Sequence, residues 1–354
     1  MEERGDEVLV SAGDDVFPCR WLVGCDGAHS AVRKSAGIGF TGTDPEFTGY
    51  SVIAALANPD ALAPGRHQSG GGVYTFEAPD VIAMADFDGG AFHRSSPITR
   101  EHVEAVLRKV SGADVRVESL DLAATWTDRS YQATEYRKGR VLLAGDAAHI
   151  HSPLGGQGLN LGLADAMNLG WKLAGEIRGD APSDLLESYQ QERHPVGAQI
   201  LDWSRAQVAL MRPQPSSRAL RAIVRDVIET RDGATYFAER ALGIGLRYDP
   251  GGSHPLIGRS APDFDLNDGT RLNQHLRAGR GLLVAFDTVP KRRALARQWH
   301  HRLNYLKSRA TNPLGLSALL VRPDGFVAWA VDGSADESEL TATIKRWFGL
   351  PSRQ

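Results

Sequence analysis

One stretch of the sequence places an acidic residue, a glycine-rich turn and a helix directly after an apolar strand. Asp146 follows the apolar run at residues 140–144, and the turn at residues 153–158 contains Gly155, Gly156 and Gly158. Ligands of α/β folds bind at the carboxyl ends of strands. Glycines let a ligand approach the backbone closely, and a helix N-terminus favours negative charge. The pattern predicts a cradle for a molecule that carries hydroxyl groups and a delocalised anion.

Simpler interpretations exist for each of these residues. The glycines could form a plain loop before a core helix, and Asp26 or Arg33 taken alone is more typical of a helix cap or a solvated side chain. His149 and His151 could form half of a metal site, but no acidic or cysteine cluster accompanies them. Structural or flavin-adjacent roles are therefore favoured for both, and no metal is predicted. The sequence has no GxSxG elbow and no GxxxxGK loop, which argues against hydrolase and P-loop functions.

The elements that position these residues follow from apolar spacing and from turn residues. Strands are expected at residues 8–10, 21–24, 50–56, 73–76, 81–87, 140–144, 282–286, 318–321 and 326–330, with a polar turn at 11–15. Helices are expected at residues 28–36, 99–112, 159–179, 183–194 with a continuation from Pro195 to about Met211, and 340–347. The second helix carries Val103, Val106, Leu107 and Val110 on one face, between a Thr99 cap and Gly112. The order of the last elements is similar to the second half of a thioredoxin-like fold.

Length and composition limit the number of domains and the kinds of partner and location that are expected. The 354 residues suggest two or three domains. The formal net charge of −3 shows no excess of basic residues, so nucleic acid is not expected as the main partner. There is no apolar run of 18 residues, so a membrane span is not expected. Cys19 and Cys25 fit neither a disulfide framework nor a CxxC pair, so a reducing, cytoplasmic location is the simplest expectation.

Two longer segments resemble a known family. The GD segment, residues 139–174 (GRVLLAGDAAHIHSPLGGQGLNLGLADAMNLGWKLA), resembles the GD motif of the class A flavoprotein monooxygenases, the para-hydroxybenzoate hydroxylase family. The DG segment, residues 21–37 (WLVGCDGAHSAVRKSAG), resembles that family's DG motif. Within the family, the chain looks most like the aromatic polyketide hydroxylases. The resemblance covers essentially the entire chain.

The resemblance implies a fold and a division into domains. The fold class would be α/β, or α+β overall, with a partial Rossmann-like FAD-binding domain, a sheet-rich substrate domain and a thioredoxin-like tail. The implied boundaries are 1–44 for the part with the DG segment, 45–136 for the substrate domain, 137–250 for the GD segment with long helices, and 251–354 for the tail.

The resemblance also implies roles for single residues. Asp146 would bind the ribityl chain of FAD, and Pro153 would lie near the flavin ring and the substrate, with Gly155 and Gly156 completing the catalytic set. Asp26 and Arg33 would contact the pyrophosphate and take part in NADPH handling. The backbone that would face the pyrimidine edge of the flavin is that of Gly155, Gly156, Gln157, Gly158, Leu159 and Asn160.

The implied activity is FAD- and NADPH-dependent hydroxylation or Baeyer–Villiger oxygenation of a polycyclic aromatic polyketide in antibiotic biosynthesis. Family members begin with a βαβ unit whose GxGxxG turn binds the ADP part of FAD, but only 25 residues precede Asp26 and such a unit needs about 30. The flavin site is therefore expected to be incomplete, and a complementing flavoprotein chain or a homo-oligomer is expected to supply the missing part. Two alternatives stay open: a flavin-independent cyclase, dehydratase or rearrangement enzyme (or a non-catalytic partner of an oxygenase), and an inactive fragment.

Overall fold

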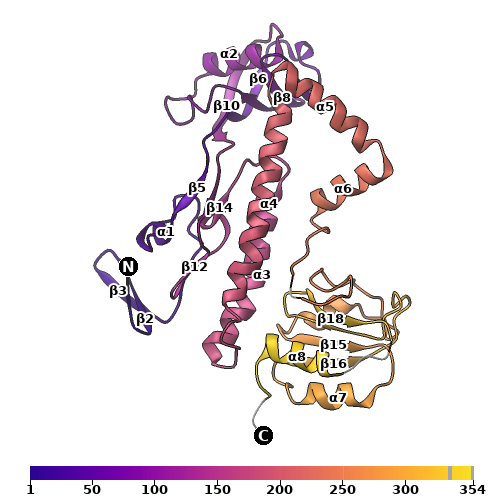
Figure 1. The fold of residues 1–354 in the computed structure, drawn as a ribbon. Coiled ribbons are helices and arrows are strands. Elements are labelled where there is room, and N and C mark those ends of the chain that lie inside the picture. The colour runs from indigo at the N-terminus through magenta and orange to yellow at the C-terminus, as the bar shows by residue number, and fades with distance from the viewer. Residues whose placement is uncertain (250, 334–336, 352–354) are drawn as a thin grey trace. The chain divides into compact units, whose positions relative to one another are not determined.

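The computed structural model describes residues 1–249, 251–333 and 337–351 (Figure 1). The chain forms two compact units: residues 1–161 with 197–237, and residues 162–196 with 238–354. The fold is of mixed α/β type, as predicted. No helix in the described part of the chain combines the length and the apolar character needed to cross a membrane. The predicted division into four domains stays a prediction.

The first unit contains a short parallel strand pair that carries both motif segments. Strand β4 (Leu22–Gly24) pairs in parallel with β13 (Val141–Leu143), and β12 (Arg137–Lys138) adds to the other side of β13. The strands predicted at 21–24 and 140–144 are therefore confirmed. A separate antiparallel sheet precedes them and consists of β1 (Glu2–Arg4), β2 (Glu7–Ala12) and β3 (Asp15–Cys19). The turn predicted at 11–15 is shorter than expected, because β2 continues to Ala12 and β3 begins at Asp15.

A five-stranded antiparallel sheet forms the main core of this unit. Its order is β10 (Val117–Thr127), β6 (Thr48–Leu56), β9 (Val81–Asp86), β8 (Gly72–Glu77) and β7 (Gly65–Gln68). Helix α2 (Arg100–Ser111) covers one face and buries the four predicted valine and leucine side chains there. The Thr99 hydroxyl caps α2 by accepting from the His102 amide, and Gly112 ends it in the left-handed conformation. The predictions for this helix are confirmed, whereas β7 and β10 were not predicted.

Shorter elements lie before, within and after the sheet in the chain, and the long helices follow them. They are α1 (Ala31–Ser35), β5 (Phe40–Thr43), β11 (Ser130–Ala133) and β14 (His149–Ile150), with 3₁₀ turns η1 (Pro59–Ala61) and η2 (Gly145–Ala147). The long helices are α3 (Gln157–Arg178) and α4 (Glu187–Met211). Helix α4 begins four residues later than predicted and runs through Pro195 without a break. Proline removes one hydrogen bond from a helix interior, and in this helix of 25 residues one missing bond does not end it. Helices α5 (Pro215–Ile228) and α6 (Arg231–Leu242) were not predicted.

The second unit contains a four-stranded sheet of order β16 (Leu303–Lys307), β15 (Gly281–Ala285), β17 (Ala318–Val321) and β18 (Val327–Val331). Helix α7 (Pro290–Arg297) links the parallel pair β15 and β16, and α8 (Glu337–Phe348) follows the hairpin β17–β18; η3 (Leu272–Leu276) precedes β15. Helix α7 and strand β16 were not predicted; they complete a βαβ–ββα arrangement, which agrees with the predicted thioredoxin-like tail. Leu282 and Leu283 point to separate apolar clusters on the two faces, so the sheet is buried on both sides.

Candidate flavin-binding site

The parallel pairing of β4 with β13 brings the DG and GD segments together. Gly24 lies opposite Leu143 in the register, and the Ala144 amide donates to the Gly24 carbonyl at 3.0 Å. Both chains then leave the sheet at the same edge, where Asp26 and Asp146 follow. The expectation that Asp146 lies at a strand's carboxyl end is met by this geometry.

Asp26 organises the start of α1. Its carboxylate accepts hydrogen bonds from the Ser30 hydroxyl at 2.5 Å and from the amides of Ala31 at 2.7 Å and Val32 at 3.2 Å. Burial of this carboxylate works to raise its pKa, but the hydrogen bonds from Ser30 and the two amides outweigh it and hold the pKa below its usual value. Asp26 thus shapes the DG loop by holding the N-terminus of α1.

Arg33 is buried, with 4% of its surface exposed, and is not the solvated side chain that its place on a short helix suggests. Its guanidinium donates to the carbonyls of Ala147 at 2.8 Å and Ala28 at 2.9 Å, and it lies 3.7 Å above the Phe40 ring. Burial lowers the pKa of the guanidinium, although the Asp26 charge works to raise it. Arg33 therefore ties the DG loop to the backbone next to Asp146.

The GD segment presents an accessible backbone and one accessible carboxylate. Asp146 is exposed on η2, and Pro153, Gly155 and Gly156 are exposed in the turn that follows. Gly155 and Gly156 have φ of 83° and 65°, conformations that favour glycine. Helix α3 then begins at Gln157, and the amide groups of its first turn have no partner within the helix. The remaining predicted residues lie on that first turn: Gly158 is half-buried, and Leu159 and Asn160 are exposed.

His151 lies beside this turn, and its structural or flavin-adjacent role stays a prediction. Its Nδ1 is 2.8 Å from the Ser152 carbonyl, which places the ring proton on Nδ1. Its Nε2 is buried without a hydrogen-bond partner, and a Cβ added at Gly158 would lie 3.5 Å from that atom. Burial lowers the pKa of His151, which favours the neutral ring. With the proton on Nδ1, Nε2 can accept a hydrogen bond. Among the described residues no group of three His, Cys, Asp or Glu side chains is placed to hold a metal ion.

The same loop contacts the five-stranded sheet. Leu154 packs against a cluster that includes Phe47, Trp126, Val208 and Met211. Trp126 lies on the sheet face opposite α2, and the same face carries partly or fully exposed side chains on three neighbouring strands. We call this the open sheet face; its members are Ser51, Ile53, Val81, Ala83, Leu122 and Ala124. Its register places Ile53 between Leu122 and Val81, which are 51% and 44% exposed.

Comparison with known families decides how this geometry is interpreted. Residues 7–204 match the FAD binding domain family, and residues 254–351 match the family described as aromatic-ring hydroxylase, C-terminal. The chain belongs to the class A flavoprotein monooxygenases. A monooxygenase of Claviceps purpurea (strain 20.1) is 45% identical over 99% of this chain and 69% of its own length. The solved structure of the OxyS anhydrotetracycline hydroxylase from Streptomyces rimosus is 37% identical, covers 99% of this chain and 74% of its own, and superposes with a TM-score of 0.87.

Another relative carries a different kind of name. The dialkyldecalin synthase of Streptomyces rugosporus is 34% identical over 99% of this chain and 73% of its own length. This name describes the construction of a ring system and not an oxygenation.

The residues present fit the flavin half of the cofactor that this family binds. The exposed Asp146 carboxylate suits sugar-like hydroxyl groups, and the Gly155–Gly156 backbone carries no side chain that would block a flat ring. The first turn of α3, at the positive end of the helix dipole, suits a delocalised negative charge. The letters GxGxxG occur at residues 37–42, but these residues lead from α1 into β5, whereas a dinucleotide loop leads from a strand into a helix.

Proposed function

We propose that this chain catalyses FAD-dependent oxygenation of a flat polycyclic aromatic molecule of the polyketide type, with NADPH as the reductant. One observation carries the proposal: the exposed Asp146 and the Gly155–Gly156 backbone share one loop with Leu154, which packs against the substrate-domain sheet. A cofactor held by this loop would lie beside the open sheet face.

The flavin contacts are assigned to the predicted residues. Asp146 would accept hydrogen bonds from the ribityl hydroxyls, and the backbone from Gly155 to Asn160 would face the pyrimidine edge of the ring. When bound, the flavin supplies the electrons and the oxygen chemistry of the reaction. The chain's own residues position it: Arg33 fixes the DG loop against Ala147, and Pro153 would border both ring and substrate.

The substrate would lie on the open sheet face. Ile53, Leu122 and Val81 form an apolar row across three strands, which suits a flat hydrophobic ring system. Ser51, paired with Ala83 and Ala124 in the next row, adds one hydroxyl for a polar substituent. Hydroxylation and Baeyer–Villiger oxygenation both need the reacting ring close to the flavin, and this placement serves either one.

The ADP half of FAD is not assigned to this chain. Among the described residues no strand leads through a glycine-rich turn into a helix in the manner of a dinucleotide site, apart from the β13-to-α3 connection already assigned to the flavin ring. A complementing strand–helix unit would hold the adenylate, and oxygenation would require it.

Flavin titration of variants tests the proposal. Asp146→Asn is expected to raise the Kd for FAD by about tenfold or more, because an amide replaces a charged acceptor of the ribityl hydroxyls. Asp14→Asn changes an exposed carboxylate in a turn of the first sheet and serves as the control. Binding is followed by flavin fluorescence, and NADPH oxidation is assayed with anhydrotetracycline in the presence of the complementing unit. An unchanged Kd for Asp146→Asn would contradict the assignment of the ribityl hydroxyls to Asp146.

The kinship with dialkyldecalin synthase favours a second candidate, flavin-independent cyclisation of a polyketide on the open sheet face. This activity would persist in flavin-free buffer and would survive Asp146→Asn. Loss of turnover on removal of flavin would reject it.

A further inference from the structure

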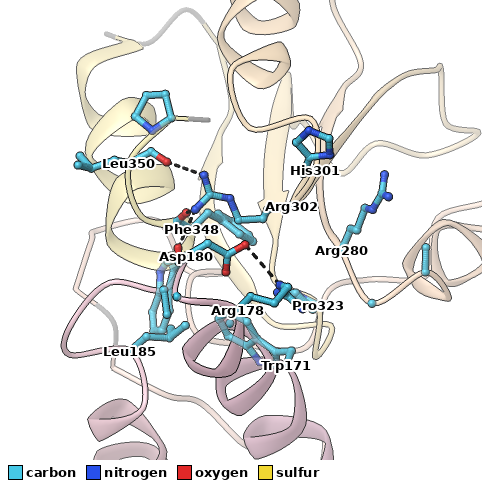
Figure 2. Close-up of a pocket in the computed structure, with 17 residues that line it drawn as sticks. Trp171, Arg178, Asp180, Leu185, Arg280, His301, Arg302, Pro323, Phe348 and Leu350 are labelled. Carbon is cyan, nitrogen blue, oxygen red and sulfur yellow. Dashed lines mark hydrogen bonds and ion pairs between the residues drawn. The ribbon is translucent and has the colours of Figure 1, made fainter. Parts of the chain in front are cut away.

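The second unit contains a cavity that involves none of the residues assigned to flavin. Its volume is about 930 Å³, in the range of small-molecule sites. Its walls come from the C-terminal end of α3, the connection to α4, the end of α8, and the loops that contain Arg280 and Arg302 (Figure 2).

One side of the cavity is aromatic. Trp171 lies 6.2 Å from Trp347 and 6.3 Å from Phe348 between ring centroids, and Leu185 packs into the same cluster. Arg322 lies 4.3 Å from the centroid of Trp347. Flat apolar walls of this kind bind rings through stacking and edge contacts.

The rim carries more positive than negative charge. Arg178 pairs with Asp180 at 3.3 Å, and Arg302 donates to the carbonyls of Asp180, Phe348 and Leu350 (Figure 2). Arg280 reaches only the His300 carbonyl, at 3.4 Å, and no described carboxylate forms an ion pair with it. One cation is therefore available for an anionic ligand.

Two buried polar atoms of the lining residues lack hydrogen-bond partners. They are the indole nitrogen of Trp347, a residue only 3% exposed, and Oδ1 of Asp180. A buried donor or acceptor without a partner is unfavourable. The first needs an acceptor and the second needs a donor, so one molecule with both groups would satisfy them.

We propose that this cavity binds a flat aromatic molecule that carries a hydroxyl group and an anionic oxygen, as hydroxyaryl carboxylates do. The ring lies against Trp171 and Phe348, the hydroxyl donates to Asp180, and the anionic oxygen accepts from Trp347 and faces Arg280. The site is separate from the flavin site and does not depend on the proposed oxygenation.

Calorimetric titration of the full chain with three naphthalenes tests this chemistry. The probe is 6-hydroxy-2-naphthoate, whose hydroxyl is too far from the carboxylate to donate to it; 2-naphthoate lacks the hydroxyl and 2-naphthol lacks the carboxylate. We expect the probe to bind at least tenfold more tightly than either comparator, because each comparator leaves one of the two buried atoms without a partner. Saturation with FAD is expected to leave this affinity unchanged.

Variants locate the binding. Trp347→Phe keeps a ring and removes the unpartnered N–H, so it is expected to weaken probe binding about tenfold and to leave binding of 2-naphthol, which has no carboxylate to accept from it, unchanged; a purely structural role would weaken both. Arg280→Ala is expected to weaken binding similarly, and Asp180→Ala to abolish the preference for the probe over 2-naphthoate. Arg277→Ala changes an exposed arginine outside the lining and is the control. Equal affinities for the three compounds, no binding, or unchanged binding to Trp347→Phe would each overturn the proposal.

Discussion

Arg33 joins the two motif segments beyond the strand pairing of β4 with β13. Arg33→Met would keep much of the apolar stem over Phe40 but leave the Ala28 and Ala147 carbonyls without their donors. Buried acceptors without partners cost about 1–3 kcal/mol each, so the free energy of unfolding should fall by about 2–4 kcal/mol. Chemical denaturation followed by circular dichroism measures this change.

Lys34 provides the matched control for Arg33. It is the next residue on α1 and is exposed, so Lys34→Met should change the free energy of unfolding by less than about 0.5 kcal/mol. Equal effects of the two substitutions would show that the Arg33 guanidinium does not fix the DG loop.

Residue types indicated the site, but their surroundings could not be predicted from sequence. The short strands and the Asp146 turn follow from local patterns, and the structure confirms the strands. The burial of Arg33 depends on a carbonyl 114 residues away, which no local pattern encodes. A structural or flavin-adjacent role was predicted for His151, but its position beside the first turn of α3 depends on the fold of the whole loop and could not be predicted from local spacing.

At the scale of elements, a buried charge cluster joins α3, α4 and the β17–β18 turn. Glu192 accepts from Lys172 at 2.7 Å and from Arg322 at 2.5 Å, and Arg322 also pairs with Asp324. Burial works to raise the pKa of Glu192, but the charges of Arg322 and Lys172 lower it to about 2. Burial also lowers the pKa of Lys172, to about 8.

The low pKa of Glu192 gives the cluster a defined pH dependence. A carboxyl whose pKa is lower in the folded state stabilises the fold above its ordinary pKa of 4.5, and this contribution is lost as pH falls toward 2. Glu192→Gln should therefore lower the free energy of unfolding by about 3–5 kcal/mol at pH 7, because two buried cations lose a partner. The difference from wild type should shrink between pH 4.5 and 2.

Asp202 offers a control on the same helix. It pairs with Arg205 but is 78% exposed, so Asp202→Asn should change stability by less than about 1 kcal/mol. Denaturation at a series of pH values distinguishes the two variants. A pH-independent loss in Glu192→Gln would mean that packing, and not charge, explains the effect.

The elements that were not predicted lack a clear local pattern of apolar residues that a core confirms. Strand β10 contains Glu118, Ser119 and Asp121 and has register irregularities against β6, so its apolar residues do not alternate cleanly. Helices α5 and α6 leave Ile223, Tyr236 and other apolar side chains exposed, so their helical spacing lacks a core to confirm it. By contrast α2 combines a cap, an apolar face and a terminal glycine, and each of these signals is local.

At the scale of the whole molecule, the proposed distribution of flavin contacts predicts that the chain binds FAD and FMN with similar affinity. In the proposed assignment the described residues hold the ribityl chain and the ring, and none of them forms a strand-to-helix dinucleotide loop for the adenylate. FAD and FMN differ in the adenylate, so residues 1–354 should bind the two with Kd values within about threefold, which corresponds to less than 1 kcal/mol. Fluorescence titration of the chain with FAD, FMN and riboflavin measures this directly.

Addition of a complementing strand–helix unit should then restore a preference for FAD, because pyrophosphate contacts with a helix N-terminus involve only the dinucleotide. If FAD bound a hundredfold more tightly than FMN to residues 1–354 alone, the adenylate would have a site in this chain. The Asp146 contacts would then explain only part of the flavin affinity.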